Sequence, residues 1–528
     1  MTLETQPPRR GLRLLRLHPD DPIAIAIEPL AAGEPLAPGG PATREAVPRG
    51  HKVALRPIAA GSAVSRFAQV IGVATADIAA GAHVHSHNLA FRPSTASRAI
   101  GTRRRALAPV PASDRASFAG FRRADGRVGT RNYVAVLTSV NCSATVARLI
   151  AERFRDPAVM RAYPHVDGVI ALTHKSGCSV AEGGESLTLL RRTLGGYARH
   201  ANVGGALIVG LGCEDNQIDR LLEVERLVPG ERLRTLVMQE EGGTSATVRA
   251  GVAQVHELLA IAETARRETV PAAHLMVGLQ CGGSDGFSGL SANPALGAAV
   301  DLLVRHGGTG ILSETPEIYG AENLLLERAA TPAVGRKLLD LIAWWEAHLA
   351  DEPHGFDDNP SPGNRAGGLT TILEKSLGAV AKGGTSDLVE VCGYAEPITT
   401  PGFVFMDSPG FDPMSATGQV ASGANLICFT TGRGSCFGCR PVPSLKLATN
   451  TPLYRRMAED IDINCGEILD GTADLAAMGE RIFQAMLAAA SGTPTASERL
   501  GYSAIPSALI GAGVQEIRRA WMAAEGAA

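Results

Sequence analysis

The spacing of apolar and polar positions changes along the chain and separates an all-β part from a later α/β part. Short apolar segments at residues 23–27, 53–55 and 70–73 alternate with glycine, proline and alanine turns. No long helical period interrupts them, so we predict a small β domain over residues 11–90. Residues 91–117 are rich in arginine, serine and proline and have no period, which predicts a linker.

From about residue 118, an apolar run followed by a turn and a helical period recurs along the chain. This alternation is typical of parallel strands connected by helices. We predict an α/β domain at residues 118–355 and a C-terminal α/β domain at residues 356–528, which together form a two-part Rossmann-like body. The expected strands lie at residues 133–140, 169–173, 206–211, 275–281, 388–391, 403–406 and 425–430, and helical sequence begins at residue 472.

A cysteine stands at or just after the end of four of these predicted strands. Successive positions are one or two βαβ units apart, at ~30 residues or more per unit. Ligands bind parallel sheets outside the carboxyl ends of the strands, so the four thiols could converge on one metal or iron–sulfur site. Burial in the core is the alternative for each, since free cysteine is among the most buried residue types. The four are Cys142, Cys178, Cys213 and Cys281.

Two short motifs allow more than one interpretation. Gly282-Gly-Ser284-Asp-Gly286 matches the nucleophile-elbow pattern after a strand, so Ser284 could serve a hydrolase. The pattern is short, and we favour an anion-binding turn that offers backbone N–H groups. Cys436-Phe-Gly-Cys439 is a C-x-x-C motif, but Pro441 follows closely. We therefore predict a loop, either structural or one in which Arg433 holds a substrate carboxylate.

Histidines gather at the end of the predicted β domain. His83, His85 and His87 alternate along the sequence, which places their side chains on one face of a strand. His51 belongs to the same domain. A metal or acid–base role and a solvated edge strand are both compatible with this pattern.

Composition narrows the class of protein. Of the 528 residues, 45% are hydrophobic and 20% charged, and the formal net charge of -3 indicates no preference for nucleic acid or anionic membranes. No uncharged apolar run is long enough to cross a bilayer, and the arginine-interrupted start does not match a secretory signal. The nine cysteines then favour a reducing, cytoplasmic location. Sheet edges and glycine-rich surfaces lead us to expect a homo-oligomer.

Seven segments spread along the chain form a recognisable set of motifs. They are Gly50-His51-Lys52, His83-Val-His85-Ser-His87-Asn88, Asp125-Gly-Arg-Val-Gly-Thr-Arg-Asn132, Gly210-Leu-Gly-Cys-Glu214, Gln280-Cys-Gly-Gly-Ser-Asp285, Asn359-Pro-Ser-Pro-Gly-Asn364 and Thr431-Gly-Arg-Gly434. Together they resemble the motifs of the altronate/galactarate dehydratase family over nearly the whole chain. The resemblance implies an SAF-type β-clip domain at the N-terminus and a two-part α/β body. It also implies loss of water from a hexonate or hexarate, giving a 2-keto-3-deoxy acid, with Fe(II) or an iron–sulfur cluster as cofactor.

The resemblance also bears on the substrate. The histidine-rich end of the first domain is more similar to altronate than to galactarate dehydratases. Sugar-acid enzymes of the family have Thr-Pro-Tyr-Gly where residues 435–438 of this chain are Ser-Cys-Phe-Gly. Related systems eliminate sulfite from sulfolactate. A sulfo-lyase, or a dehydratase of another small hydroxy acid, is therefore the alternative to an altronate dehydratase.

Dehydration requires removal of the proton next to the carboxylate and expulsion of the neighbouring hydroxyl, so we expect a base, an acid and a metal. On this hypothesis iron binds some of the four cysteines near His174. The catalytic candidates are His51, His85, His87, His174, Glu314, Glu317 and Lys446. The substrate-binding candidates are Ser284, Asp285, Asn359, Asn364, Thr431 and Arg433.

Overall fold

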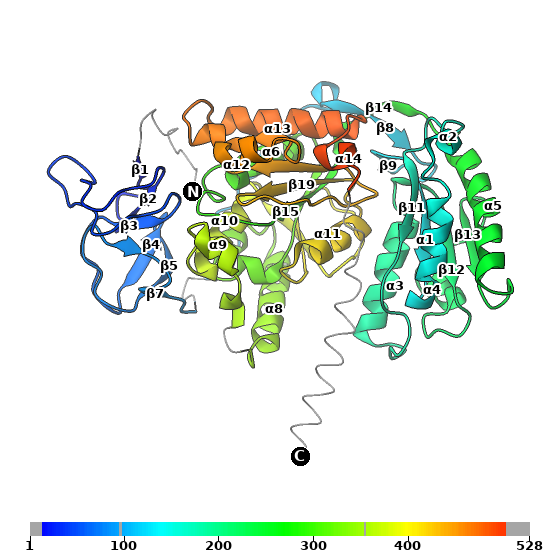
Figure 1. Cartoon of the computed structure of the whole chain (residues 1–528), viewed down its shortest axis with the longest axis horizontal. Helices are drawn as coiled ribbons and strands as arrows, with labels where there is room; N and C mark the ends of the chain where they lie inside the picture. The colour runs from blue at the N-terminus through cyan, green and yellow to red at the C-terminus, as the bar shows by residue number, and fades with distance from the viewer. Residues whose placement is uncertain (1–12, 94–97, 353–354, 503–528) are drawn as a thin grey trace, which may run out of the picture.

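The computed structural model describes residues 13–93, 98–352 and 355–502, which form three domains (Figure 1). A small β domain lies at one end, a large α/β domain occupies the middle, and a second α/β domain lies at the other end. The predicted order of an all-β part followed by α/β sequence is therefore confirmed. Within the described residues, no helix is both long and apolar enough to cross a membrane.

The N-terminal domain consists of two small antiparallel sheets around one apolar core. The strand orders are β1-β2-β3-β6 and β4-β5-β7. Ile23, Val64, Ile71 and Val84 are buried in the core that the two sheets share. The strands are β1 (Leu14–Leu15), β2 (Ile23–Ala26), β3 (Lys52–Ala54), β4 (Ala63–Arg66), β5 (Gln69–Ala74), β6 (His83–Val84) and β7 (Leu89–Ala90).

The second domain is built on a parallel four-stranded sheet with helices on both faces. The strand order is β11-β10-β12-β13. The apolar sides of α1 and α5 bury one face, and α3 buries the other. The elements are β10 (Tyr133–Thr138), η2 (Asn141–Ser143), α1 (Ala144–Glu152), α2 (Pro157–Met160), β11 (Gly168–Leu172), α3 (Glu185–Ala198), β12 (Val203–Gly210), α4 (Ile218–Val224), β13 (Leu233–Val237) and α5 (Thr244–Ala262).

The C-terminal domain contains a parallel seven-stranded sheet of order β17-β18-β16-β15-β19-β20-β21. Helices α6 and α13 pack together against it, while α11 contacts β15 and also α3 of the second domain. Its strands are β15 (Met276–Cys281), β16 (Thr309–Leu312), β17 (Leu388–Cys392), β18 (Gly402–Met406), β19 (Leu426–Thr431), β20 (Ser444–Ala448) and β21 (Ile463–Asn464).

Helices connect these strands, and a small antiparallel sheet, β14-β8-β9, joins the two α/β domains. The helices are η3 (Ala272–His274), α6 (Ala292–Arg305), η4 (Thr315–Ile318), α7 (Glu322–Leu326), α8 (Pro332–His348), η5 (Gly355–Asp358), α9 (Pro362–Ala366), α10 (Ile372–Ala381), α11 (Asp412–Ala421), α12 (Thr451–Arg456), η6 (Cys465–Ile468), α13 (Leu475–Ala490) and α14 (Ala496–Arg499). The remaining elements are η1 (Ala112–Asp114), β8 (Ser117–Arg122), β9 (Val128–Gly129) and β14 (Arg267–Pro271).

The strand pairing corrects one expected boundary. We placed a division between residues 355 and 356, but β15 pairs in register with β19, and β16 pairs with β18. One sheet therefore draws its strands from both sides of that position. The two α/β domains instead separate after α5, where the chain leaves the four-stranded sheet.

The N-terminal domain contacts the C-terminal domain through a buried ionic group. Glu374 on α10 accepts hydrogen bonds of 2.8 Å from Lys52 Nζ and 2.5 Å from Arg66. Beside them, a Cβ at Gly368 would lie 2.3 Å from the Gly50 carbonyl oxygen, so only glycine allows the two backbones to come this close. Charge pairing and close backbone contact thus stabilise this position of the N-terminal domain.

Candidate functional site

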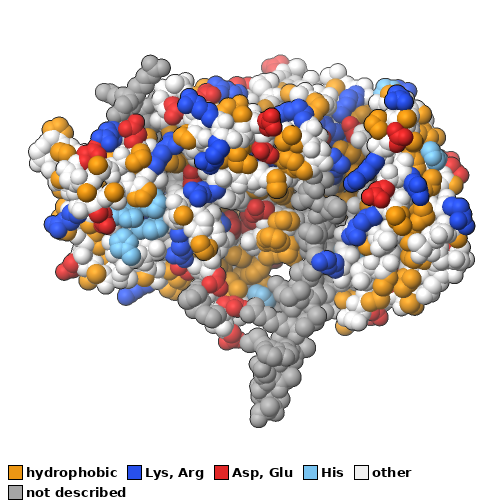
Figure 2. All heavy atoms as spheres, in the orientation of Figure 1, with side chains coloured by type: hydrophobic (Ala, Val, Ile, Leu, Met, Phe, Trp, Pro, Cys, Tyr) orange, Lys and Arg blue, Asp and Glu red, His pale blue; other side chains and the backbone are white. Residues whose placement is uncertain are grey.

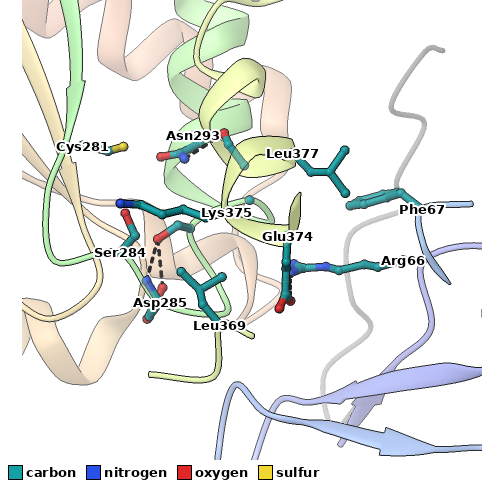
Figure 3. A pocket seen from close by; sticks show the side chains of 13 residues that line it. Arg66, Phe67, Cys281, Ser284, Asp285, Asn293, Leu369, Glu374, Lys375 and Leu377 are labelled. Carbon is teal, nitrogen blue, oxygen red and sulfur yellow. Dashed lines mark hydrogen bonds and ion pairs between the residues drawn. The ribbon is translucent and has the colours of Figure 1, made fainter. Parts of the chain in front are cut away.

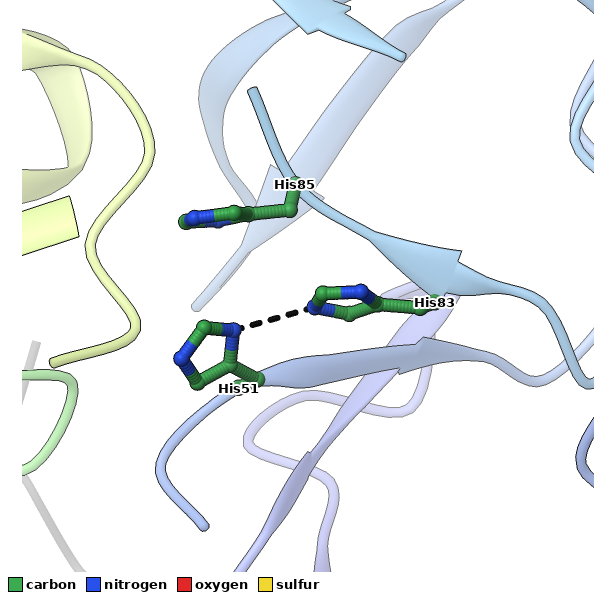
Figure 4. A group of neighbouring side chains, drawn as sticks. All are labelled: His51, His83 and His85. Atoms are coloured by element: carbon green, nitrogen blue, oxygen red, sulfur yellow. Dashed lines mark hydrogen bonds between the residues drawn. The ribbon is translucent and has the colours of Figure 1, made fainter. Parts of the chain in front are cut away.

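Three histidines meet at the edge of the N-terminal domain that faces the C-terminal domain (Figure 4). His51 Nδ1 lies 3.0 Å from His83 Nε2, and the ring centroids of His51 and His85 are 4.7 Å apart. One ligand atom from each of the three lies within 4.8 Å of the others. Histidine side chains are visible together on this face of the molecule in Figure 2. We call this group the histidine triad.

The triad has the donor chemistry of a metal site. His51 Nε2 is 3.3 Å from the Ala366 carbonyl oxygen, a contact that leaves Nδ1 to accept or to coordinate. His85 Nδ1 is buried without a hydrogen-bond partner among the described residues. Burial, then His51, lowers the pKa of His83 to about 3 and that of His85 to about 4. Neutral imidazoles are the form that binds Fe(II) or Zn²⁺, so these residues fit a metal ion.

Of the predicted histidines, the structure brings His51 and His85 together and leaves His87 at the rim. The exposed ring of His87 is 5.4 Å from that of His83. Our candidate residues omitted His83, although the alternation that placed three histidines on one face includes it.

A second group of ionisable side chains is buried at the carboxyl ends of β15 and β16. Lys382 Nζ donates to Cys281 Sγ at 2.9 Å, and the Cys281 thiol lies 3.7 Å from Glu317 Oε2. Lys375 Nζ donates to Glu317 Oε1 at 2.5 Å, and Glu314 lies 4.0 Å from Lys382. We call these five residues the buried charge cluster.

Protonation states within this cluster follow from burial and charge. Burial raises the pKa of the Cys281 thiol to about 11, which favours the neutral thiol at pH 7. The ammonium groups of Lys375 and Lys382 lie beside the two carboxyl groups of the cluster. Burial would raise the pKa of Glu317, but Lys375 and Lys382 offset it and hold the pKa below its ordinary value. Cys281, Glu314 and Glu317 each place one ligand atom within 4.8 Å of the others, so this group too could hold a metal ion.

Glu314 differs from its neighbours in backbone and in partners. It adopts a φ of 74°, in the left-handed region that non-glycine residues rarely occupy. Both of its carboxylate oxygens are buried and have no hydrogen-bond partner among the described residues. Burial, then the charge of Glu317, raises the pKa of Glu314 well above its ordinary value. Strained backbone and buried polar groups without hydrogen bonds concentrate at functional sites, and a raised pKa suits a proton donor, so Glu314 is a candidate general acid.

Asn359 and Asp412 complete the surroundings of the cluster. Asn359 Nδ2 donates to Glu317 Oε1 at 2.8 Å, and its Oδ1 accepts from Lys375 at 2.7 Å. Asn359, which we predicted to bind substrate, therefore contacts two side chains of the cluster in this structure. A Cβ at Gly282 would lie 2.1 Å from Asp412 Oδ2, so the glycine after Cys281 makes room for this carboxylate.

Asp412 is expected to make thermal stability depend on pH. Burial, then Glu317, raises its pKa from 3.8 to about 6. The folded state therefore binds the proton of the Asp412 carboxyl group more tightly than the unfolded state does. The stabilisation that this proton gives to the folded state is lost as the pH rises from about 4 to above 6. Asp412→Asn should raise Tm at pH 8 and leave it nearly unchanged at pH 4, measured by scanning calorimetry. An equal shift at both pH values would contradict this assignment.

A small cavity of about 30 Å³ lies between the cluster and the N-terminal domain (Figure 3). Cys281, Ser284 and Lys375 line one side, and Arg66 and Phe67 of the N-terminal domain line the other. It has room for one or two water molecules. A six-carbon acid needs a larger space, which would open if the N-terminal domain moved away.

The turn after β15 connects the two groups. Gly283 accepts hydrogen bonds from the backbone N–H groups of Gly432 and Arg433, at 3.0 and 2.8 Å. Gly286 N donates to Gly367 O at 2.8 Å, next to the Ala366 carbonyl that contacts His51. The glycines that we interpreted as an anion-binding turn therefore permit close backbone contacts on both sides.

Arg433 is the predicted substrate residue whose position fits best. Its side chain passes within 3.3 Å of the place where a Cβ of Gly367 would be, beside the loop that contacts the histidine triad. The side chain is exposed, and within the described residues its guanidinium forms no hydrogen bond or ion pair. A free, exposed guanidinium can bind a carboxylate bidentately.

The other predicted substrate residues hold the loops in place. Asp285 is buried and accepts from Thr449 Oγ1 at 3.0 Å and from Asn450 at 3.1 Å. Asn364 Nδ2 donates to the Ser284 carbonyl at 2.9 Å, and Thr431 Oγ1 accepts from the Gly434 N–H at 3.0 Å. These contacts give them positioning roles.

Two predicted catalytic residues lie elsewhere. His174 donates through Nε2 to the Thr138 carbonyl at 2.8 Å and accepts at Nδ1 from the Ser176 N–H at 3.2 Å. Both ring nitrogens are therefore used by the backbone. Lys446 donates to the Phe437 carbonyl at 3.3 Å and to the Tyr502 hydroxyl, so it supports the loop before β20.

The four cysteines do not share one site. Cys142, Cys178 and Cys213 follow β10, β11 and β12 of the second domain, whereas Cys281 ends β15 of the other sheet. Equivalent places in successive βαβ units lie together only when the strands belong to one sheet. The C-x-x-C motif lies in a loop, as predicted, with Cys436 exposed and Cys439 buried.

Comparison with known proteins decides the family. The model for the altronate/galactarate dehydratase SAF domain matches residues 12–92. The model for the D-galactarate dehydratase/altronate hydrolase second domain matches residues 120–263, and that for the D-galactarate/altronate dehydratase C-terminal domain matches residues 272–510. The chain belongs to the altronate/galactarate dehydratase family. The N-terminal β domain is therefore its SAF domain.

Individual relatives agree with this. An altronate dehydratase of Escherichia coli K12 is 35% identical over 92% of this chain and 97% of its own length. A galactarate dehydratase (L-threo-forming) of the same organism is 37% identical over 90% of this chain and 92% of its own length. The (2R)-sulfolactate sulfo-lyase subunit beta of Chromohalobacter salexigens is 32% identical over 73% of this chain and 95% of its own length.

Family membership and geometry both speak against a serine hydrolase. Ser284 is buried, and among the described residues no histidine forms a hydrogen bond with it. A nucleophilic serine needs such a base. The hydrolase alternative therefore has no support in this dehydratase-family chain.

Sequence reasoning missed two lysines of the buried charge cluster. Lys375 lies within α10, and Lys382 is the residue that caps its C-terminal end. Their charged positions in an otherwise apolar helical stretch could have revealed them. Lysine and glutamate that are buried in such a stretch must be paired with opposite charges, which predicts an ionic site.

Proposed function

We propose that this chain is a hydro-lyase that removes water from altronate to give a 2-keto-3-deoxy acid. The observation that carries the proposal is Glu314, which is strained, buried and without a hydrogen-bond partner among the described residues, beside Glu317, whose pKa is held low. Two carboxyl groups whose surroundings push their pKa values in opposite directions suit an acid and a base acting in one reaction.

The cluster supplies what a dehydration needs. Glu317 would take the proton next to the substrate carboxylate, and Glu314 would protonate the departing hydroxyl. Negative charge on the carboxylate end grows as the proton leaves, and the ammonium groups of Lys375 and Lys382 are positioned to stabilise it. Asn359 keeps Glu317 in its ionised, hydrogen-bonded form.

Arg433 and the SAF domain would position the substrate. The guanidinium of Arg433 would bind the carboxylate next to the turn at Gly283. Arg66 and Phe67 line the far wall of the small cavity, so a substrate would enter as the SAF domain moves away. Its return would exclude water from the buried charge cluster.

The histidine triad fits Fe(II), because three neutral imidazole nitrogens lie close together and one of them lacks a partner. Bound there, a metal would supply Lewis-acid polarisation of a substrate oxygen. His51 would remain oriented by its contact with the Ala366 carbonyl.

The test is formation of 2-oxo acid by protein purified without oxygen. Altronate, galactarate, other hexonates and hexarates, and sulfolactate are offered with and without added Fe(II). We expect Fe(II)-dependent product from altronate. His83→Ala should lose Fe(II) and activity together, whereas His256→Ala, an exposed histidine on α5, should keep both.

Other outcomes separate the alternatives. If only galactarate gave product, galactarate would replace altronate as the proposed substrate. If sulfolactate gave sulfite and no sugar acid gave a 2-oxo acid, the chain would be a sulfo-lyase. The altered residues 435–438 favour including that second reaction. Activity that persists in the His83→Ala protein would remove the histidine triad from the reaction.

A further inference from the structure

A second and larger cavity lies where the SAF domain, the linker and the C-terminal domain meet. Its volume is about 200 Å³, compared with about 30 Å³ for the cavity beside the buried charge cluster. Sites for drug-sized ligands have volumes of ~300–1,000 Å³, so this one suits a compact molecule. We call it the outer cavity. It is lined by Phe67 and Gln69 of the SAF domain, by Arg103 and Arg105 of the linker, and by residues in and after α7 and α10.

The outer cavity shares a wall with the small cavity beside the cluster. Phe67, Gly289 and Leu377 line both of them. Figure 3 shows the Phe67 ring and the Leu377 side chain pointing toward one another, one from the SAF domain and the other from α10. A ligand in the outer cavity would therefore contact side chains that also bound the small cavity.

The turn between β4 and β5 holds Phe67 in this place. Phe67 and Ala68 both have a φ of 56°, in the left-handed region that is costly for residues other than glycine. Their backbone N–H groups donate to the carboxylate of the buried Asp21, at 2.9 and 3.0 Å. Because this carboxylate stabilises the strained turn, the position of the Phe67 ring is set before any ligand binds.

Backbone hydrogen bonds also fix the linker beside the cavity. The Arg103 N–H donates to the Glu327 carbonyl at 2.7 Å, and the Arg105 N–H donates to Asp387 Oδ1 at 2.5 Å. The linker therefore follows the C-terminal domain closely at this point, and it presents the side chains of Arg103 and Arg105 to the cavity.

The charged residues that line the outer cavity are three arginines and one glutamate, which makes it an anion site. Arg328 is buried and donates to backbone carbonyls at 2.7 and 2.8 Å, and Arg103 pairs with Glu327 at 3.4 Å. The Arg105 guanidinium is exposed and forms no hydrogen bond or ion pair within the described part of the chain. A guanidinium of this kind can bind a carboxylate through two parallel hydrogen bonds.

The rest of the wall favours a hydrocarbon group. Hydroxyl groups placed against an apolar wall lose their hydrogen bonds to water without replacement. A sugar acid has a hydroxyl on each carbon beyond its carboxylate, so it fits this wall less well than an acid with a hydrocarbon chain. The apolar residues that line the cavity are Phe67, Leu324, Leu325, Leu377, Val380 and Ala381.

We propose that the outer cavity binds a short aliphatic carboxylate, with its carboxylate on Arg105 and its hydrocarbon chain against Phe67 and Leu377. A ligand bound there contacts the SAF domain and the C-terminal domain at once, and so stabilises their association. Binding itself is independent of the proposed dehydration. Slower turnover in the presence of the ligand rests on the proposed function, in which the SAF domain moves away to admit substrate.

The test is isothermal titration calorimetry of the full chain with hexanoate and with gluconate, which share six carbons and one carboxylate and differ in their hydroxyls. We expect saturable binding of one hexanoate per chain. Arg105→Gln should weaken it by about tenfold or more, the usual effect of losing a charge-assisted hydrogen bond. Arg104→Gln is the matched control, because Arg104 pairs with Asp387 and does not line the cavity, and it should bind hexanoate as wild type does.

Amide hydrogen exchange tests whether the ligand connects the two domains. Hexanoate should slow exchange in β4 and β5, residues 63–74, in the wild-type and Arg104→Gln proteins and have little effect in Arg105→Gln. This measurement needs no turnover, so it remains informative if the dehydratase assay fails. Unchanged exchange in these strands at saturating hexanoate would show that the ligand does not contact the SAF domain.

Three results of the titrations would overturn the proposal. One is the absence of hexanoate binding to the wild-type protein. Another is hexanoate binding that survives in Arg105→Gln and is lost in Arg433→Gln, which would place the ligand at the candidate active site. The third is gluconate binding that Arg105→Gln weakens while hexanoate does not bind, which would make the outer cavity a site for hydroxylated acids.

Discussion

Replacement of Glu314 by glutamine is expected to lower kcat for sugar-acid dehydration by about 10²–10⁴-fold, the usual contribution of a general acid. Glutamine keeps the size of the side chain but cannot give up a proton to the departing hydroxyl. Because the carboxylate oxygens have no partner among the described residues, the change should cost little stability. KM should change much less than kcat.

Steady-state kinetics with the best substrate of the panel measures this effect. Glu257→Gln, an exposed glutamate on α5, is the matched control and should retain full activity. Glu314→Asp should recover part of the rate, because the acid is present but displaced. If Glu314→Gln keeps kcat within a few-fold of wild type at an unchanged Tm, Glu314 is not the acid.

Glu374→Gln is expected to destabilise the attachment of the SAF domain by about 3–5 kcal/mol, the usual cost of breaking a buried ion pair. The variant would leave Lys52 and Arg66 buried without their anion. Burial alone would raise the pKa of Glu374, but Lys52 and Arg66 lower it to about 2. Its stabilisation is therefore complete at neutral pH and is lost as the pH falls from about 4.5 toward 2.

Denaturant unfolding combined with amide hydrogen exchange of β3 measures the loss. Glu390→Gln removes the exposed pair with Lys337 and should change stability by about 0–1 kcal/mol. The wild-type and Glu374→Gln proteins should differ less at pH 3 than at pH 7. Equal exchange rates in β3 of both proteins would show that the ionic group does not secure the SAF domain.

The apolar periods predicted local elements well, and the reason is physical. Residues 133–137 and 403–406 are continuous apolar runs because strands inside a parallel sheet are buried on both faces. The apolar pattern within each strand does not determine which strands pair with one another. The order β17-β18-β16-β15-β19-β20-β21 brings residues more than a hundred positions apart into register, so the expected boundary at residue 355 was wrong.

The candidate site residues also divide into those that local sequence could propose and those that only the folded structure could assess. Residue type and the family resemblance proposed His51, His85, Glu314, Glu317 and Arg433 as site residues, and their roles stay predictions. Residue type and resemblance could not separate Cys281 from the other three cysteines, nor reveal that the backbone occupies both nitrogens of His174. The homo-oligomer expected from sheet edges stays a prediction.

By itself, the sequence determined the β domain, the α/β character of the rest, the family resemblance and most of the residue types at the site. These depend on local period and on short motifs, which neighbouring residues specify. Only the tertiary structure decided that Lys375, Lys382 and Glu374 are buried charges, that His83 joins the triad, and that three cysteines share one edge. Burial and pairing depend on segments far apart in the chain, and no local pattern records which of them meet.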